Sequence, residues 1–315
     1  MVDILFLGTG GGRVNLIRQL RGTGGFLLLG QRLTIHVDPG PGALVRLHDA
    51  RQDPAKTDAI VVTHMHVDHV SDAGVLTEAM THFALQKGGC LIASKSVLQG
   101  DQYGDKSVST YHQSKLEQCL VLRPGDEKKI TIAHPARKSH QEAESAHSRR
   151  GPNAPASFTI RAIPTRHDDP DGFGFVLEMD GLKIGYTSDT EYIPKVHNLA
   201  YAGVDALIAN NLKRANDGLA GHLQSDHLVT LLKAAKPKLC ILTHMGMGIL
   251  QSGPEAEAAA IAKASGVPTF AARDGYYYCT DRCGWFKPNR GGGSAPSSVS
   301  GSSGSSPVKG QKKLV

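Results

Sequence analysis

Four side chains that can bind a metal ion fall within six consecutive positions of the sequence. They belong to the segment Thr63-His64-Met65-His66-Val67-Asp68-His69, which follows the short apolar run at 59–62. A single histidine is usually a surface or structural residue, but that reading does not explain so dense a cluster. In an extended or tightly turned segment, His64 and His66 point to one side, while Asp68 and His69 can reach a second ion. Imidazole and carboxylate ligands suit zinc, and also iron or manganese.

Four more candidate residues occur later in the chain, and three of them directly follow an apolar run. They are His167 after 158–163, Asp189 after 182–187 and His244 after 239–243. The fourth, His222, lies between Asp189 and His244, before a predicted helix. Because polar residues at strand ends can meet at one edge of a sheet, this pattern predicts a common site.

The elements that must position these residues are short strands, with helices mainly in the second half. We predict strands at 4–7, 25–29, 33–37, 59–63, 158–163, 174–179, 182–187, 206–209 and 239–243. The dipeptide Asp180-Gly181 favours a tight hairpin, and helices are predicted at 75–85 and 225–235, with Ser225 as a helix cap. Strands followed by a strand-helix-strand unit indicate the α/β class and an αββα sandwich.

The composition is that of a globular protein, with 40% apolar and 20% charged residues among 315. No stretch is apolar enough for a transmembrane helix and no secretory signal is evident, so we expect a cytoplasmic protein without membrane contact. The formal charge of +6 is weak evidence for nucleic acid, because much of it lies in two polar segments. These are a polar insertion at about 136–157, which we expect to be mobile, and a Gly/Ser/Lys tail at 286–315, which we expect to be disordered. Cys279 and Cys283 are weak candidates for a structural metal site.

The ordered motifs resemble those of the metallo-β-lactamase superfamily. The His-x-His-x-Asp-His segment, the later His, the Asp and the final His match residues 64–69, 167, 189 and 244, and the resemblance predicts a catalytic domain over 1–285. It implies two divalent ions, zinc first and manganese or iron as alternatives. By that similarity His64, His66 and His167 hold one ion, Asp68, His69 and His244 hold the other, and Asp189 bridges them. Two ions so placed can share a hydroxide that attacks the substrate. Asp68 is therefore predicted to be catalytic as well as a ligand, and Asp38 could brace the ligand loop.

His222 favours the phosphodiesterase branch of that superfamily. The cyclic ribose-phosphate phosphodiesterase of phosphonate breakdown and, less closely, ribonuclease Z carry a similar extra histidine, which implies a catalytic role for His222 at the phosphate. A helix-capping or surface histidine is the alternative. Ribonuclease Z typically inserts its tRNA-binding arm between the third-motif His and the bridging Asp, but His167 and Asp189 are only 22 positions apart. We therefore expect a small or cyclic phosphodiester as substrate.

Other functions stay open from the sequence. The first alternative is tRNA 3′-processing or another RNA cleavage of the ribonuclease Z type. The insertion would then contact RNA, through the basic residues His134, Arg137, Lys138, His140, His147, Arg149 and Arg150. A metal-binding protein without activity, an oxygen-reducing diiron protein and a β-lactam hydrolase are less favoured. A homodimer is expected by similarity to the branch.

Overall fold

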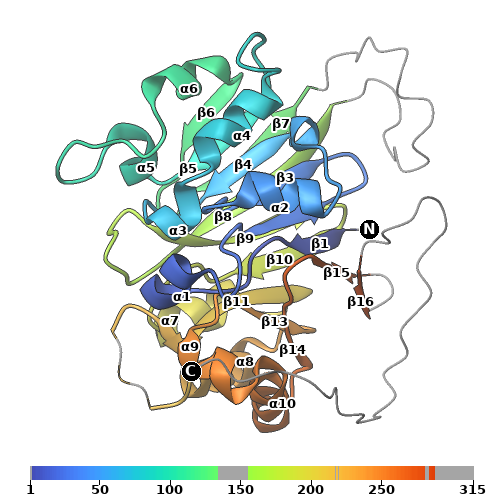
Figure 1. Ribbon diagram of the computed structural model, residues 1–315. Helices are drawn as coiled ribbons and strands as arrows, with labels where there is room; N and C mark the ends of the chain where they lie inside the picture. The colour runs from blue at the N-terminus through green and yellow to red at the C-terminus, as the bar shows by residue number, and fades with distance from the viewer. Residues whose placement is uncertain (1, 134–154, 217, 219, 281–283, 288–315) are drawn as a thin grey trace, which may run out of the picture.

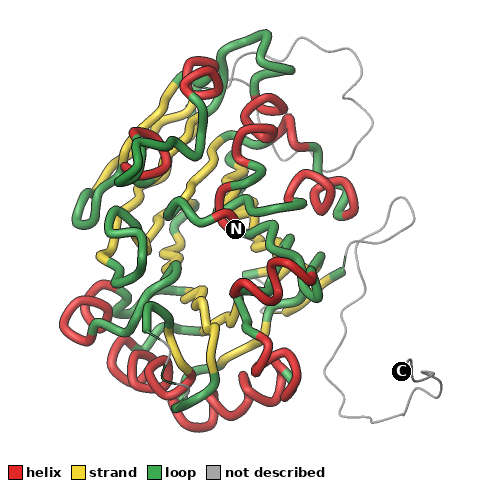
Figure 2. Tube along the Cα trace, turned by 60° about the vertical axis from the view of Figure 1, so that its left-hand side comes forward, coloured by secondary structure: helices red, strands yellow, loops and turns green. Residues whose placement is uncertain are grey.

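Two β-sheets lie face to face, with helices on the outside of each. The computed structural model describes residues 2–133, 155–216, 218, 220–280 and 284–287. In Figure 1 the first half of the chain forms the upper layers and the second half most of the lower layers. Figure 2 shows the same arrangement turned by 60°, with most of the helices around the outside of the strands. The predicted αββα sandwich is confirmed.

The first sheet has the strand order β16-β15-β1-β2-β3-β4-β5-β6. Its strands are β1 (Asp3–Phe6), β2 (Phe26–Leu29), β3 (Thr34–Val37), β4 (Ala59–Val62), β5 (Cys90–Ala93), β6 (Gln118–Val121), β15 (Tyr276–Cys279) and β16 (Gly284–Phe286). The strands from β3 to β6 are parallel, and β1 pairs antiparallel with β2 and β15. The C-terminal end of β4 leads directly into residues 63–69, which carry the first four candidate ligands.

The second sheet has the order β14-β13-β11-β10-β9-β8-β7, and β12 pairs with β11. Its strands are β7 (Glu127–Ile132), β8 (Ala156–Pro164), β9 (Phe173–Met179), β10 (Leu182–Tyr186), β11 (Ala206–Lys213), β12 (Leu223–Gln224), β13 (Cys240–Thr243) and β14 (Thr269–Ala271). β9 and β10 form the predicted hairpin, in which Met179 pairs with Leu182. Asp180 and Gly181 both have positive φ, as the tight turn requires.

Alternate residues of the central strands belong to different hydrophobic clusters. In β1, Ile4 and Phe6 pack between the sheets, whereas Leu5 faces the outer helices. In β11, Ile208 lies between the sheets and Leu207 packs against the helices. Because both faces are buried, such strands appear in the sequence as continuous apolar runs.

The helices cover the two outer faces. They are α1 (Gly12–Arg18), α2 (Ala43–Asp49), a 3-10 turn (Pro54–Lys56), α3 (Val67–Val70), α4 (Ala73–Met80), α5 (Lys95–Gln99), α6 (Thr110–Lys115), α7 (Pro194–Ala200), α8 (Ser225–Ala235), α9 (Met247–Ser252) and α10 (Pro254–Ser265). Among the described residues, none of these helices has the length and apolar character needed to cross a membrane. The cytoplasmic location stays a prediction.

Two local predictions are wrong. The helix predicted at 75–85 spans Ala73–Met80 instead, because the backbone turns left-handed from His82 to Ala84. Ser225 does not cap α8. Its hydroxyl donates to Lys213 O and accepts from Asn211 Nδ2, so it ties the helix to β11.

The two segments predicted to lie outside the core are mostly beyond the described residues. β8 already begins at Ala156, so the last two positions of the predicted insertion belong to the sheet. β16 extends to Phe286, the first position of the predicted tail. Pro155 and Lys287 are also described, whereas residues 134–154, with the basic candidates at 134–150, and 288–315 are outside the described part of the chain. The domain boundary at 285 stays a prediction.

Candidate metal centre

The predicted ligand residues converge at one end of the two sheets, although they come from distant segments. His64, His66, Asp68 and His69 follow β4, His167 follows β8, Asp189 follows β10 and His244 follows β13. The first group belongs to the first sheet and the other three residues belong to the second. Groups of these residues have ligand atoms within 4.8 Å of one another. The site therefore spans both sheets.

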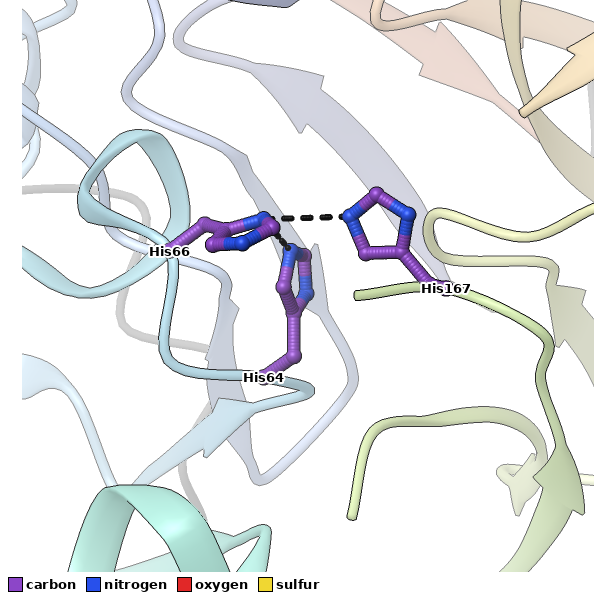
Figure 3. Close-up of side chains that lie close together, drawn as sticks. All are labelled: His64, His66 and His167. Atoms are coloured by element: carbon purple, nitrogen blue, oxygen red, sulfur yellow. Dashed lines mark hydrogen bonds between the residues drawn. The ribbon is translucent and has the colours of Figure 1, made fainter. Parts of the chain in front are cut away.

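Three imidazoles meet in the first half of the site (Figure 3). His66 Nδ1 lies 3.2 Å from His64 Nε2 and 3.0 Å from His167 Nε2. One proton cannot satisfy both contacts, so at least one pair of nitrogens faces each other without a hydrogen bond. A cation at the common point would accept a lone pair from each ring. This donor set fits zinc.

The outer nitrogens of these rings fix which nitrogen is free to bind an ion. His167 Nδ1 lies 2.9 Å from the carbonyl oxygen of Gly221, so it carries the proton and leaves Nε2 with the lone pair. His64 Nδ1 lies 3.1 Å from Thr63 Oγ1, whose own proton goes to Asp38. That nitrogen therefore donates as well. Both rings present an unprotonated Nε2 to the site, the tautomer that a metal ligand needs.

The second half of the site contains Asp68, His69 and His244. His244 Nε2 lies 3.2 Å from His69 Nε2 and 3.3 Å from Asp68 Oδ2, which is 3.8 Å from His69 Nε2. His69 Nδ1 donates to Asp38 Oδ2 at 3.0 Å. Asp38 also accepts from the Thr63 backbone N–H and from the hydroxyl of Tyr186. The expectation that Asp38 braces the ligand loop is consistent with these four bonds, counting the Thr63 hydroxyl.

Asp189 lies between the two halves. Its Oδ2 is 3.6 Å from His69 Nε2 and 3.8 Å from His167 Nε2. Its Oδ1 accepts a 2.7 Å hydrogen bond from Asn210 Nδ2. The amide thus directs Oδ2 toward both groups of ligands, which is the position a bridging carboxylate would need.

The charges of the site favour a cation. Burial alone would raise the pKa of Asp68 and of Asp189, but nearby imidazoles, His69 foremost for Asp68 and His244 for Asp189, hold both carboxyls below their usual range. Burial lowers the pKa of His64 well below 6.5, so this ring is neutral. Burial also acts to lower the pKa of His69, yet the carboxylates of Asp68, Asp189 and Asp38 raise it well above 6.5. The carboxylates therefore attract a positive charge, which a bound metal ion would supply.

His222 lies beside this cluster, directly before β12. Its Nδ1 is 3.7 Å from Asp189 Oδ2, and its side chain is 16% exposed. Its ring meets that of His167 edge to face and stacks on that of His244. Burial lowers the pKa of His222 to about 4, although Asp189 acts in the opposite direction. His222 is thus a neutral imidazole at pH 7, close to the ligands and partly open to solvent.

The glycine segment before α1 lies against the second half of the site. A Cβ on Gly11 would be 2.2 Å from His244 Nδ1, so this position has no room for a side chain. The N–H of Gly11 donates to Met245 O, and Met245 N donates to Thr9 O. This pairing joins the start of the chain to the last ligand.

The sequence did not identify several residues that organise the site. Asn210 donates a hydrogen bond to Asp189, and Tyr186 donates one to Asp38. Ser188 donates to Thr63, and Glu191 accepts from Gly221, so both contact residues next to the site. Asn210 had a usable signal, since it directly follows the apolar run 206–209. Cys279 is buried and Cys283 lies outside the described residues, so the structural metal site proposed for them cannot be placed.

Comparisons with known proteins agree with this fold. Residues 34–245 match the family model described as the β-lactamase superfamily domain. A protein of Methanocaldococcus jannaschii, the uncharacterized protein MJ1374, is 38% identical over 276 residues, which is 87% of this chain and 93% of the relative. Ribonuclease Z of Mycobacterium bovis is 27% identical over 225 residues, 68% of this chain and 71% of that enzyme.

Two solved structures share the fold. The metallo-β-lactamase fold protein YhfI from Bacillus subtilis aligns with a TM-score of 0.65 and 20% identity, over 88% of this chain and 98% of its own. A diphosphatase of the PhnP family aligns with a TM-score of 0.59 and 17% identity, over 88% of this chain and 97% of its own.

Proposed function

Because this chain belongs to the β-lactamase superfamily, we propose that it is a binuclear metal-dependent phosphodiesterase that hydrolyses a small or cyclic phosphodiester. The observation that carries the proposal is the convergence of seven ligand-type side chains with His222 beside them. The first metal would be held by His64, His66 and His167. The second would be held by Asp68, His69 and His244, with Asp189 shared.

Two divalent ions bound there, zinc first and manganese or iron as alternatives, would lower the pKa of a water molecule and neutralise charge on the phosphate. In the reaction a water oxygen bonds to phosphorus, the ester P–O bond breaks, and the departing oxygen ends with a proton. Asp38 and Asn210 hold the ligand groups in position for this step. His222, neutral at pH 7, presents an N–H that can stabilise the developing phosphoryl oxyanion or the departing oxygen.

The choice of a small substrate is supported by the hairpin between His167 and Asp189. That segment consists of a short loop and the strands β9 and β10, joined by the two residues Asp180 and Gly181. It leaves no place for an inserted substrate-binding arm. A diphosphatase of the PhnP family shares the fold.

The similarity to ribonuclease Z keeps RNA cleavage as the second candidate. RNA binding through basic residues should weaken steeply as salt rises, because bound counterions are released. A salt titration of binding to a labelled precursor tRNA therefore separates the two. Tight, salt-sensitive binding together with cleavage would favour the second candidate.

The test is hydrolysis of bis(p-nitrophenyl) phosphate by protein loaded with zinc or manganese. We expect turnover that is lost on chelation and falls by about 10²-fold or more in His222→Ala, the usual contribution of such a group. Glu178→Ala, which removes a surface ion pair with Lys183, is the matched control. If only a lactone or a β-lactam is cleaved, the proposed substrate class is wrong.

A further inference from the structure

We infer that Glu191 is a positioning residue that sets the location of His222 by holding the backbone of Gly221; this rests on the proposed function. Glu191 lies two positions after Asp189, and its Oε1 accepts a 2.9 Å hydrogen bond from the Gly221 N–H. Its own backbone N–H donates to Arg166 O at 3.0 Å. Glu191 therefore connects three loops of the site, which carry His167, Asp189 and His222.

Gly221 is restrained at both of its polar backbone atoms. Its N–H is bound by the Glu191 carboxylate, and its carbonyl accepts from His167 Nδ1 at 2.9 Å. Its φ of +80° is left-handed, and a Cβ would lie 3.1 Å from His167 Nδ1. Only glycine fits here without strain. Since His222 is the next residue, the direction in which its side chain leaves the chain depends on this restrained unit.

The side chain of His222 depends on that backbone anchor. The nearest carboxylate oxygen, Asp189 Oδ2, is 3.7 Å from His222 Nδ1, which is longer than a hydrogen bond. The rings of His167 and His244 flank it at centroid distances of 4.8 and 6.1 Å. These contacts limit the tilt of the ring, but they do not fix its distance from the candidate ligands. The bond from Glu191 to Gly221 supplies that restraint.

The alternative role for Glu191 is a surface ion pair. Its Oε2 lies 3.3 Å from Arg166 Nη1, but the Arg166 side chain is 66% exposed, whereas that of Glu191 is 29% exposed. Exposed pairs of this kind contribute little. Removal of Arg166 and removal of Glu191 should therefore have different effects if the bond to Gly221 is what matters.

The experiment measures kcat and KM on bis(p-nitrophenyl) phosphate, and metal content, for single and double variants of the metal-loaded full chain. Glu191→Ala should lower kcat by about 10- to 100-fold, the usual effect of losing an outer hydrogen bond of a metal site, and leave KM and the bound metal unchanged. Glu191→Gln keeps an acceptor for Gly221 and should stay within a few-fold of the wild type. Arg166→Ala and the control Glu178→Ala should match the wild type.

The decisive comparison is the double variant. If Glu191 acts through His222, adding Glu191→Ala to His222→Ala should cause no further loss, because the positioned group is already gone. An equal loss in both backgrounds overturns the inference, as does a loss of bound metal in Glu191→Ala, which would place the effect at His167. A wild type that cleaves no diester, or a His222→Ala variant with full activity, overturns the proposed function.

A measurement without substrate keeps the two failures distinct. In metal-loaded protein with labelled histidines, the imidazole NMR signals of His222 should shift or broaden in Glu191→Ala, while those of His64 and His66 stay in place. Unchanged His222 signals overturn the inference whatever the substrate proves to be.

Discussion

Asp38→Asn should weaken the second metal site although it leaves all seven proposed ligands intact. Asp38 is 2% exposed and receives four hydrogen bonds. Three of them end on Oδ2, from the hydroxyls of Thr63 and Tyr186 and from His69 Nδ1, and the fourth, from the Thr63 N–H, ends on Oδ1. An amide has one acceptor oxygen, so either orientation turns an NH₂ group toward a buried donor.

The size of the effect follows from these contacts. The less costly orientation keeps the oxygen at the Oδ2 position and leaves the Thr63 N–H facing the amide nitrogen. One unsatisfied buried donor costs about 1–3 kcal/mol of unfolding free energy, and the three remaining bonds lose their charge assistance. His69, with a neutral partner, becomes a poorer ligand. We expect affinity for the second ion to fall by about 10- to 100-fold, or roughly 1.4–2.7 kcal/mol.

The assay is competition for zinc against a fluorescent chelator, together with denaturant unfolding of the metal-free protein. The matched control is Asp58→Asn, a buried aspartate at the other end of β4 whose Oδ2 accepts from Thr34 N–H. The control should lose stability but keep both metal affinities. If Asp38→Asn binds the second ion within about twofold of the wild type, the bracing argument is refuted.

Two further predictions concern close packing and buried histidine. Gly11→Ala should displace the His244 ring, because the new Cβ would lie 2.2 Å from its Nδ1. Metal analysis of this variant should then find one bound ion per chain. The control Gly248→Ala should keep two ions, because a Cβ there meets nothing closer than 3.9 Å. Burial lowers the pKa of His36 to about 4, so below pH 6.5 the unfolded chain binds a proton that the folded chain does not. The unfolding free energy should therefore fall by about 3 kcal/mol between pH 6.5 and 4 from this group alone. His36→Gln keeps a donor for Gly24 O. In urea titrations across that pH range, its unfolding free energy should fall less steeply than that of the wild type. An unchanged slope in His36→Gln would contradict this assignment.

The sequence was sufficient to place the candidate ligands at strand ends, because each one follows an apolar run that forms a strand in the structure. His64 follows β4, Asp189 follows β10 and His244 follows β13, as predicted. Several strands were missed, among them the short strand Cys90–Ala93 and the edge strand Glu127–Ile132. A four-residue apolar run does not distinguish a strand from a buried turn of helix, and an edge strand with one exposed face has few apolar residues.

The supporting hydrogen bonds could not be predicted in the same way. Asn210 reaches Asp189 across two neighbouring strands, and Glu191 reaches Gly221 across 30 positions of chain. Neither contact follows from spacing, since each depends on which strands become neighbours. The contact between Gly11 and His244 joins residues more than 230 positions apart and has no local signature beyond the glycines themselves.

The division of the ligands between two sheets has a consequence for biosynthesis. The first four ligand side chains follow β4, but their partners follow β8, β10 and β13, up to residue 244. By the proposed ligand assignment, a ribosome-bound chain that has not yet released His244 can offer only part of the coordination set, so it should bind a metal ion more weakly than the finished protein. If the proposed ligands bind metal, we therefore expect loading to be completed only after the chain leaves the ribosome.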